Sequence, residues 1–266
     1  MTVIHVEYSL SDAGLLPRQL SVCRAGDPIE VAMIRLDVAP ETVRAAAALL
    51  SDEERHRASR FAFDCDRRRF TVARSRLRRM LGARLNVRPE AVELVYGHRG
   101  KPALSRRFAE PNLQFNVAHC DDLAVFAFSS GAPVGVDLET VRPMRDADDL
   151  AAHFFSRGEY ASYQSLARCD KPLAFFSCWT RKEALVKALG DGLFRPLDSF
   201  DVSLAPGEPA AILRFEDSSG DSCGWTLHDF SPGPGLVGAV VVGKRAEDFA
   251  ALAYPERGAL RPALFS

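Results

Sequence analysis

WTRKEALVKALG, residues 179–190, is the segment around which the rest of this chain can be organised. Apolar side chains recur every three to four residues from Phe175 to Leu189, which predicts a helix. Gly190-Asp191-Gly192 follows and can adopt the left-handed turn that ends a helix. The apolar residues cover more than one narrow stripe, so we expect much of this helix to be buried. It nevertheless carries four charges, at Arg181, Lys182, Glu183 and Lys187.

Glu183 and Lys187 lie four residues apart and are therefore neighbours on one helix face. The simplest interpretation is a surface ion pair, which contributes only about 0–1 kcal/mol. A functional site is the alternative, and the rest of the chain decides between the two.

Composition narrows the class of protein. The chain has 266 residues, 47% of them hydrophobic, which suffices for one large domain or two small ones. A net charge of −1 gives no overall case for nucleic acid. Arginines are dense between Arg55 and Arg88, which indicates either a local phosphate-binding surface or a solvated helix face.

Cysteine usage and apolar run length bear on location. The six cysteines lack CxxC spacing, so neither a zinc site nor a redox motif is predicted. No apolar run approaches the roughly 20 residues of a membrane span. The N-terminus lacks the basic start and apolar centre of a secretory signal. We expect a reduced, cytoplasmic protein.

The chain divides into two parts at a linker-like stretch, Ser129–Pro133. We expect an N-terminal extension at 1–30, one half at 31–133, a second at 134–248 and a tail at 249–266. Strands are predicted at 31–38, 92–96, 113–117, 123–128, 134–139, 196–204, 211–215, 225–230 and 237–242. Helices are predicted at 40–50, from 51, at about 66–85, from 156 and at 175–189.

The strand 134–139 places two carboxylates together. Its residues alternate strictly, so Gly135, Asp137 and Glu139 share one face. Residues two apart on a strand are about 6.6 Å apart, and their oxygens can converge on one cation. Gly135 would leave room beside them. A solvent-facing strand with two acids by chance is the alternative.

The two halves resemble each other internally. Ser51 and Glu54 form a capping box, and so do Ser156 and Glu159 about 105 residues later. The segment 74–82 likewise resembles 182–190, with Arg88-Pro89 matching Arg195-Pro196. We therefore expect two copies of one unit, packed face to face.

The two copies differ at informative positions. Ser75 and Arg79 stand where the second copy has Glu183 and Lys187. A cleft between the copies would then be basic on one wall and acidic on the other. Such a cleft suits a phosphorylated ligand joined to a divalent metal, because hard cations take carboxylate and phosphate oxygens together.

Three motifs in this order carry a family resemblance. They are Gly135-Val136-Asp137-Leu138-Glu139, Phe155-Ser156-x-x-Glu159-Tyr160 and Trp179-x-x-Lys182-Glu183-Ala184-x-x-Lys187. Together they resemble the signature of the Sfp-type 4′-phosphopantetheinyl transferases. Gly100-Lys101-Pro102, Phe115–His119 and Pro196–Phe200 also match, and the resemblance runs from about residue 31 to 245.

The resemblance implies an α+β fold of two similar halves related by a pseudo-twofold, with coenzyme A in the cleft between them. The activity implied is transfer of the 4′-phosphopantetheine arm to a serine of an acyl or peptidyl carrier protein, with release of 3′,5′-ADP. Carriers of fatty-acid, polyketide and peptide-synthetase systems all fit. We expect a monomer, because one chain supplies both walls, and neither nucleic acid nor membrane as partner.

The resemblance also assigns site residues. Asp137, Glu139 and Glu183 match the Mg²⁺ ligands, and Lys101, His119, Lys182 and Lys187 match positions that contact the phosphates or nucleotide of coenzyme A. Arg55 and Arg57 lie where the family has basic residues near the 3′-phosphate. The family often has serine before the histidine, where this chain has Ala118. Glu159 is expected to serve first as the cap of its own helix.

The catalytic residues expected are Glu183 and Lys187. Glu183 would be a metal ligand or the general base, and Lys187 would stabilise or protonate the leaving phosphate. Two other functions fit parts of the pattern: a non-catalytic module that binds coenzyme A or a carrier protein, and a metal-dependent phosphohydrolase. The absence of a GxxxxGK[ST] motif argues against a P-loop enzyme.

Overall fold

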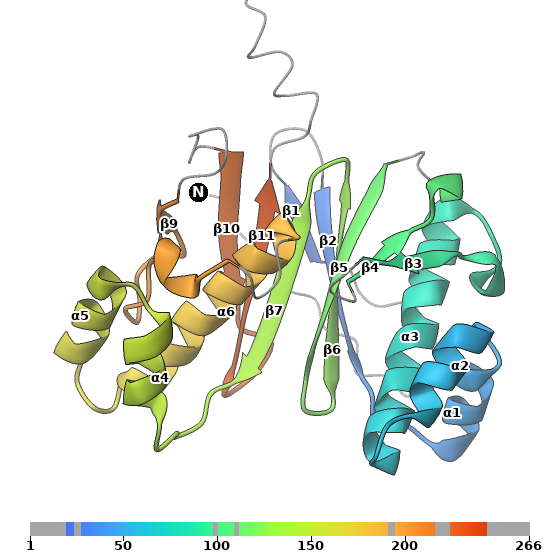
Figure 1. The fold of residues 1–266 in the computed structure, drawn as a ribbon, viewed down its shortest axis with the longest axis horizontal. Coiled ribbons are helices and arrows are strands. Elements are labelled where there is room, and N and C mark those ends of the chain that lie inside the picture. Colours follow the sequence, from blue (N-terminus) through green and yellow to red (C-terminus); the bar gives the residue numbers. More distant parts are fainter. Residues whose placement is uncertain are drawn as a thin grey trace, which may run out of the picture.

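The computed structural model describes residues 20–23, 28–97, 101–108, 112–190, 195–215 and 224–243. Within these ranges the chain forms two α+β halves (Figure 1). Most of the expected N-terminal extension and the whole tail at 249–266 lie outside them.

The first half is an antiparallel sheet covered by helices. Its four strands lie in the order β1 (Leu20–Cys23), β2 (Pro28–Arg35), β6 (Leu123–Ser130), β5 (Leu113–Cys120). The helices are α1 (Pro40–Ala47), α2 (Asp52–Ser59) and α3 (Asp64–Leu85). A 3-10 turn at Pro89–Ala91 leads into a short ladder of β3 (Leu94–Tyr96) and β4 (Pro102–Leu104), and another turn spans Arg106–Phe108.

The second half repeats this plan. Its strands lie in the order β10 (Trp225–Phe230), β11 (Leu236–Gly243), β7 (Val134–Thr140). The helices are α4 (Ala147–Phe154), α5 (Arg157–Ser165) and α6 (Lys171–Leu189). A 3-10 turn at Leu197–Ser199 leads into the ladder of β8 (Asp201–Val202) and β9 (Ile212–Arg214).

The order of elements confirms the internal repeat. Each half runs as strand, three helices, 3-10 turn, short ladder and hairpin, and the sheet orders β2-β6-β5 and β7-β11-β10 correspond. In Figure 1 the helices of the two halves lie on opposite flanks, with the strands of both between them. The pseudo-twofold α+β fold expected from the sequence is therefore present.

Two expectations about individual segments need correction. Residues 20–23, assigned to an N-terminal extension, pair with β2 as the edge strand of the first sheet. The strand predicted at 196–204 is mostly a 3-10 turn with two residues of β8. Its carbonyls at Leu197 and Phe200 accept hydrogen bonds from Lys182 and are therefore not available to a neighbouring strand.

Strand β7, at the edge of the second sheet, has one face toward each half. Val134, Val136 and Leu138 are buried in a core that includes Val125 and Ala127 of β6. On the opposite face, a Cβ at Gly135 would lie 2.1 Å from the carbonyl oxygen of Ala184 in α6. The room expected beside the acids at Gly135 is thus filled by α6, which rests directly on the strand.

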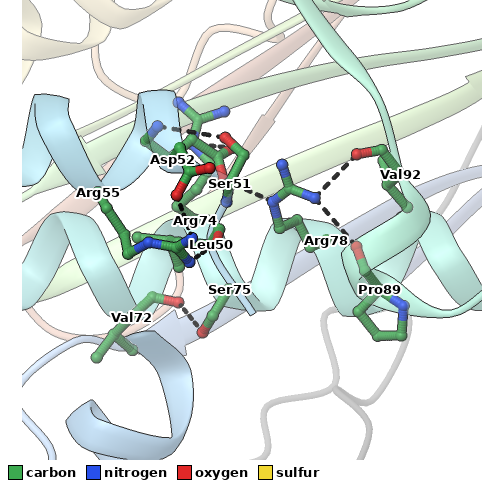
Figure 2. A network of polar contacts seen from close by, with 11 residues as sticks. Leu50, Ser51, Asp52, Arg55, Val72, Arg74, Ser75, Arg78, Pro89 and Val92 are labelled. Atoms are coloured by element: carbon green, nitrogen blue, oxygen red, sulfur yellow. Dashed lines mark hydrogen bonds and ion pairs between the residues drawn. The ribbon is translucent and has the colours of Figure 1, made fainter. Parts of the chain in front are cut away.

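Each half contains a buried glutamate that ties its helices together. In the first half, the Glu54 carboxylate accepts from the Ser51 N–H and pairs with Arg78 at 2.6 Å. Arg78 also donates to the carbonyl oxygens of Pro89 and Val92 (Figure 2). One carboxylate thereby fixes the start of α2, the long helix α3 and the turn that follows it.

The second half has the same arrangement with a lysine. Glu159 accepts from the N–H groups of Ser156 and Val202, and Lys182 pairs with it at 2.7 Å. Lys182 donates its other two hydrogens to the carbonyls of Leu197, at 2.6 Å, and Phe200, at 2.7 Å. These carbonyls lie 108 residues after those of Pro89 and Val92, close to the spacing of 105–108 residues at which the two halves match.

We predict that Lys182→Met costs about 3–5 kcal/mol in free energy of unfolding, because Glu159 keeps a buried, uncompensated charge. Urea denaturation measures the loss. Lys171→Met is the matched control: Lys171 pairs with Asp148, whose side chain is 59% exposed, so a loss of about 1 kcal/mol or less is expected. Equal losses for the two variants would contradict a structural role for Lys182.

Candidate active site

Three carboxylates from two elements come together where α6 rests on β7. Asp137 and Glu139 share the β7 face that α6 covers, and Glu183 comes from α6 itself. Burial, the Asp137 charge and the Glu183 charge raise the pKa of Glu139 to about 7. The pKa of Glu183 is raised by burial and by Asp137. The acids are thus close enough to repel one another, as expected from their motifs.

Lys187 is the cation that offsets this charge. Its Nζ lies 2.5 Å from Oδ1 of Asp137, a residue that is 5% exposed. Burial raises the pKa of Asp137 and the ammonium opposes that shift. The Lys187 ammonium also opposes the rise in the pKa of Glu183, its predicted neighbour on the helix.

The acids fit a divalent cation in chemistry, although their present arrangement does not enclose one. Oδ2 of Asp137 is buried without a hydrogen-bond partner among the described residues. Three carboxylates supply the hard oxygen ligands that Mg²⁺ takes. No set of three acidic, histidine or cysteine side chains in the described ranges is arranged to hold an ion as it stands. Asp137 instead forms an ion pair with Lys187.

Lys101 reaches this centre from the first half. Its Nζ donates to the backbone carbonyl of Lys187 at 2.5 Å, which joins the loop before β4 to the last turn of α6. Burial and the nearby Lys187 ammonium lower the pKa of Lys101. The structure therefore brings Lys101 and Lys187 together, two cations from different halves.

His119 lies near the end of β5 and is exposed to solvent. Partial desolvation beside the cavity and the charges of Arg74 and Lys187 lower its pKa. It lines a cavity of about 390 Å³ in the first half, together with Arg57, Arg74, Phe70 and Val117. Ala118 is instead buried in the core shared by the two halves, so its side chain does not line this cavity.

Arg74 is a cavity residue that the sequence reasoning missed. Its guanidinium and that of Arg57 lie 5.4–5.8 Å from the ring centres of Phe70 and Tyr96. Arg74 Nη1 and the Tyr96 hydroxyl have no hydrogen-bond partner among the described residues. In the described part of the chain, the one buried acid near Arg57 and Arg74 is Glu54, which also pairs with Arg78. The positive charge of the two guanidinium groups is therefore not fully neutralised and can attract an anion. The repeat aligns Arg74 with Lys182, which was the available signal.

Two predicted ligand contacts do not reach this region. Arg55 donates to Leu50 and Asp52 and lines a different hollow, because residues two apart on a helix face different ways. Lys182 is fully buried, with all three hydrogens donated inside the protein. Neither side chain is placed to meet a ligand beside His119 or Asp137.

Sequence comparison places both halves in one superfamily. Residues 38–131 match the family described as 4′-phosphopantetheinyl transferase, N-terminal, and residues 133–240 match the 4′-phosphopantetheinyl transferase superfamily.

Individual relatives agree with these matches. The chain is 39% identical over 227 residues to the 4′-phosphopantetheinyl transferase HetI of Nostoc, covering 85% of this chain and 92% of that protein. It is 26% identical over 209 residues to Sfp of Bacillus subtilis, covering 79% and 90%. Among solved structures, Thermotoga maritima holo-(acyl-carrier-protein) synthase aligns at 20% identity with a TM-score of 0.33, over 42% of this chain and 63% of that one.

Both halves match the family, and the Nostoc relative is similar over nearly its whole length. The Sfp-type resemblance expected from the three motifs is confirmed, and the chain belongs to the 4′-phosphopantetheinyl transferase superfamily.

Proposed function

We propose that this enzyme transfers 4′-phosphopantetheine from coenzyme A to a serine of a carrier protein in a Mg²⁺-dependent reaction that releases 3′,5′-ADP. Family membership supports the transfer itself. The observation that carries the rest is the meeting of Asp137, Glu139 and Glu183 with Lys187 and Lys101, beside a cavity lined by two arginines. Carboxylates that could bind Mg²⁺ lie next to ammonium groups that could bind phosphate. This combination suits a pyrophosphate group with its Mg²⁺ ion.

Asp137, Glu139 and Glu183 would hold the Mg²⁺. The unpartnered, buried Asp137 Oδ2 and the mutual repulsion of the three acids support this assignment. When bound, the ion supplies positive charge that offsets the pyrophosphate of coenzyme A.

The basic residues would bind the parts of coenzyme A that do not react. Arg57 and Arg74 offer guanidinium groups to a phosphate in the cavity, and the His119 ring can donate a hydrogen bond there. Lys101 and Lys187 are placed near the acids, where the pyrophosphate would lie.

The chemistry exchanges the phosphoanhydride bond of coenzyme A for a phosphoester bond to the carrier serine. The serine oxygen attacks the β-phosphorus, which carries the pantetheine, and a new P–O bond forms. The bond from that phosphorus to the bridging oxygen breaks, and the electron pair leaves with 3′,5′-ADP. The serine proton passes to a carboxylate, for which Glu183 is the candidate, while Lys187 stabilises the leaving phosphate.

Mass spectrometry of an apo carrier protein tests this function. The carrier is incubated with coenzyme A, Mg²⁺ and the enzyme. A gain of one phosphopantetheine, with 3′,5′-ADP released, supports the transferase. Free phosphate without that gain favours the phosphohydrolase, and binding without either product favours the non-catalytic module.

Location and assembly remain predictions from the sequence. None of the helices in the described part of the chain is long and apolar enough to cross a membrane. The cytoplasmic location is tested by cell fractionation and the monomer by sedimentation. The type of carrier is tested by offering fatty-acid, polyketide and peptide-synthetase carriers in the mass assay.

We predict that Glu183→Gln lowers transfer at least about 100-fold while the melting temperature stays near that of the wild type. The amide keeps the side-chain volume but removes both the charge and the proton acceptor. The mass assay measures transfer and circular dichroism confirms the fold. Near-normal Mg²⁺-dependent transfer by this variant would contradict the assignment, as would undiminished wild-type transfer in excess chelator.

We predict that Arg57→Ala raises the KM for coenzyme A about tenfold or more and changes kcat little, because a charge-assisted hydrogen bond to a non-reacting group contributes uniform binding. Arg55→Ala is the matched control. It removes the same side chain two residues away, in a different hollow, so its KM should stay near that of the wild type. Equal effects of both changes would contradict the cavity assignment.

A further inference from the structure

Both lysines that the proposed function gives to the pyrophosphate are bound to the protein itself. Lys187 Nζ lies 2.5 Å from Asp137 Oδ1, and Lys101 Nζ lies 2.5 Å from the carbonyl oxygen of Lys187. Each ammonium uses one of its three hydrogens in these contacts, so a ligand phosphate can either share the ammonium with the protein or draw it away.

Of these two contacts, the ion pair between Lys187 and Asp137 is the one in which the lysine can change partner. The Asp137 side chain is 8% exposed and is carried by β7, which lies between the two halves. The Lys187 side chain is 28% exposed and has four rotatable bonds on the last turn of α6. Lys101 holds the backbone of that turn, so the ammonium can move while the helix stays in place.

The Lys187 ammonium pairs with only one of the two carboxylate oxygens of Asp137. Oδ1 receives Lys187, whereas Oδ2 is buried without a partner among the described residues. Glu139 and Glu183 add negative charge nearby. Lys187 pairs with one Asp137 oxygen and Lys101 donates to a backbone carbonyl, so Asp137 Oδ2 is left for a divalent ion.

We propose that Lys187 is a built-in counter-ion that competes with the divalent cation for Asp137 until a ligand phosphate draws it away. This inference rests on the proposed function of the same site. In the free protein the Lys187 ammonium weakens cation binding by direct competition. With coenzyme A bound, the phosphates accept the ammonium and Asp137 becomes available to the ion.

The exchange makes cation and coenzyme A binding cooperative. Each ligand removes an obstacle to the other, and the increase in affinity must be the same in both directions. A permanent structural pair between Lys187 and Asp137 would behave differently, because removing the lysine would then damage the site instead of opening it.

Mn²⁺ titration of the free protein, followed by electron paramagnetic resonance, separates these two cases. We expect Lys187→Met to bind Mn²⁺ about tenfold more tightly than the wild type, because the competing charge is gone. Lys187→Arg should stay near the wild type, since it keeps the charge. Lys171→Met is the matched control for loss of one lysine charge far from the acids, and its affinity should also be unchanged.

A melting curve guards against a misfolded variant. Saturating Mn²⁺ should raise the Tm of Lys187→Met more than that of the wild type, as expected when a ligand binds the folded state more tightly. Unchanged or weaker Mn²⁺ binding by Lys187→Met, or equal gains in Lys171→Met, overturns the proposal.

The wild-type mass assay keeps this result separate from the proposed function. Transfer by the wild type together with unchanged Mn²⁺ affinity in Lys187→Met overturns only the counter-ion role. No transfer by the wild type overturns the proposed function, whatever the Mn²⁺ titrations give.

Discussion

The close contact between α6 and β7 is the constraint on which the site depends. A side chain at Gly135 would collide with the backbone of α6, 2.1 Å from Ala184 O and 2.3 Å from Ala188 N. Glycine lets the helix lie directly on the strand, which brings Glu183 and Lys187 over Asp137. The same strand buries Val136 and Leu138 against the first half, so one element carries two of the three acids and packs against both halves.

The repeat supplies the scaffold, and the differences between its copies give the two halves different charged side chains. Glu54 with Arg78 and Glu159 with Lys182 are the same structural device, in which a capping carboxylate and a cation tie a long helix to the following turn. Such buried pairs are costly to break, so they fix where each helix lies. At the positions left free, the first half presents arginines to a cavity and the second presents acids. Two halves of similar fold thus differ in the charge that they present.

The sequence predicted the elements and the motifs better than the directions of single side chains. Alternation placed Asp137 and Glu139 on one face, and the two capping boxes are present as expected. Lys182 sits in the same motif as Glu183, yet adjacent helix residues point about 100° apart, and Lys182 turns into the core. Arg55 and Arg57 diverge for the same reason. Arg74 was missed because its environment, Phe70 and Tyr96, is assembled only when α3 meets β3.

The most direct test of this account is the transfer activity of Gly135→Ala measured beside Gly158→Ala. A methyl group at Gly158 would meet only the Ser156 hydroxyl oxygen, at 3.8 Å, so that variant should retain near wild-type transfer and stability. At Gly135 the methyl group must push α6 off β7, because backbone atoms cannot move aside as a flexible side chain can. We expect Gly135→Ala to lose most of its transfer and to melt at a lower temperature. Normal transfer by Gly135→Ala would contradict the claim that the contact between α6 and β7 assembles the site.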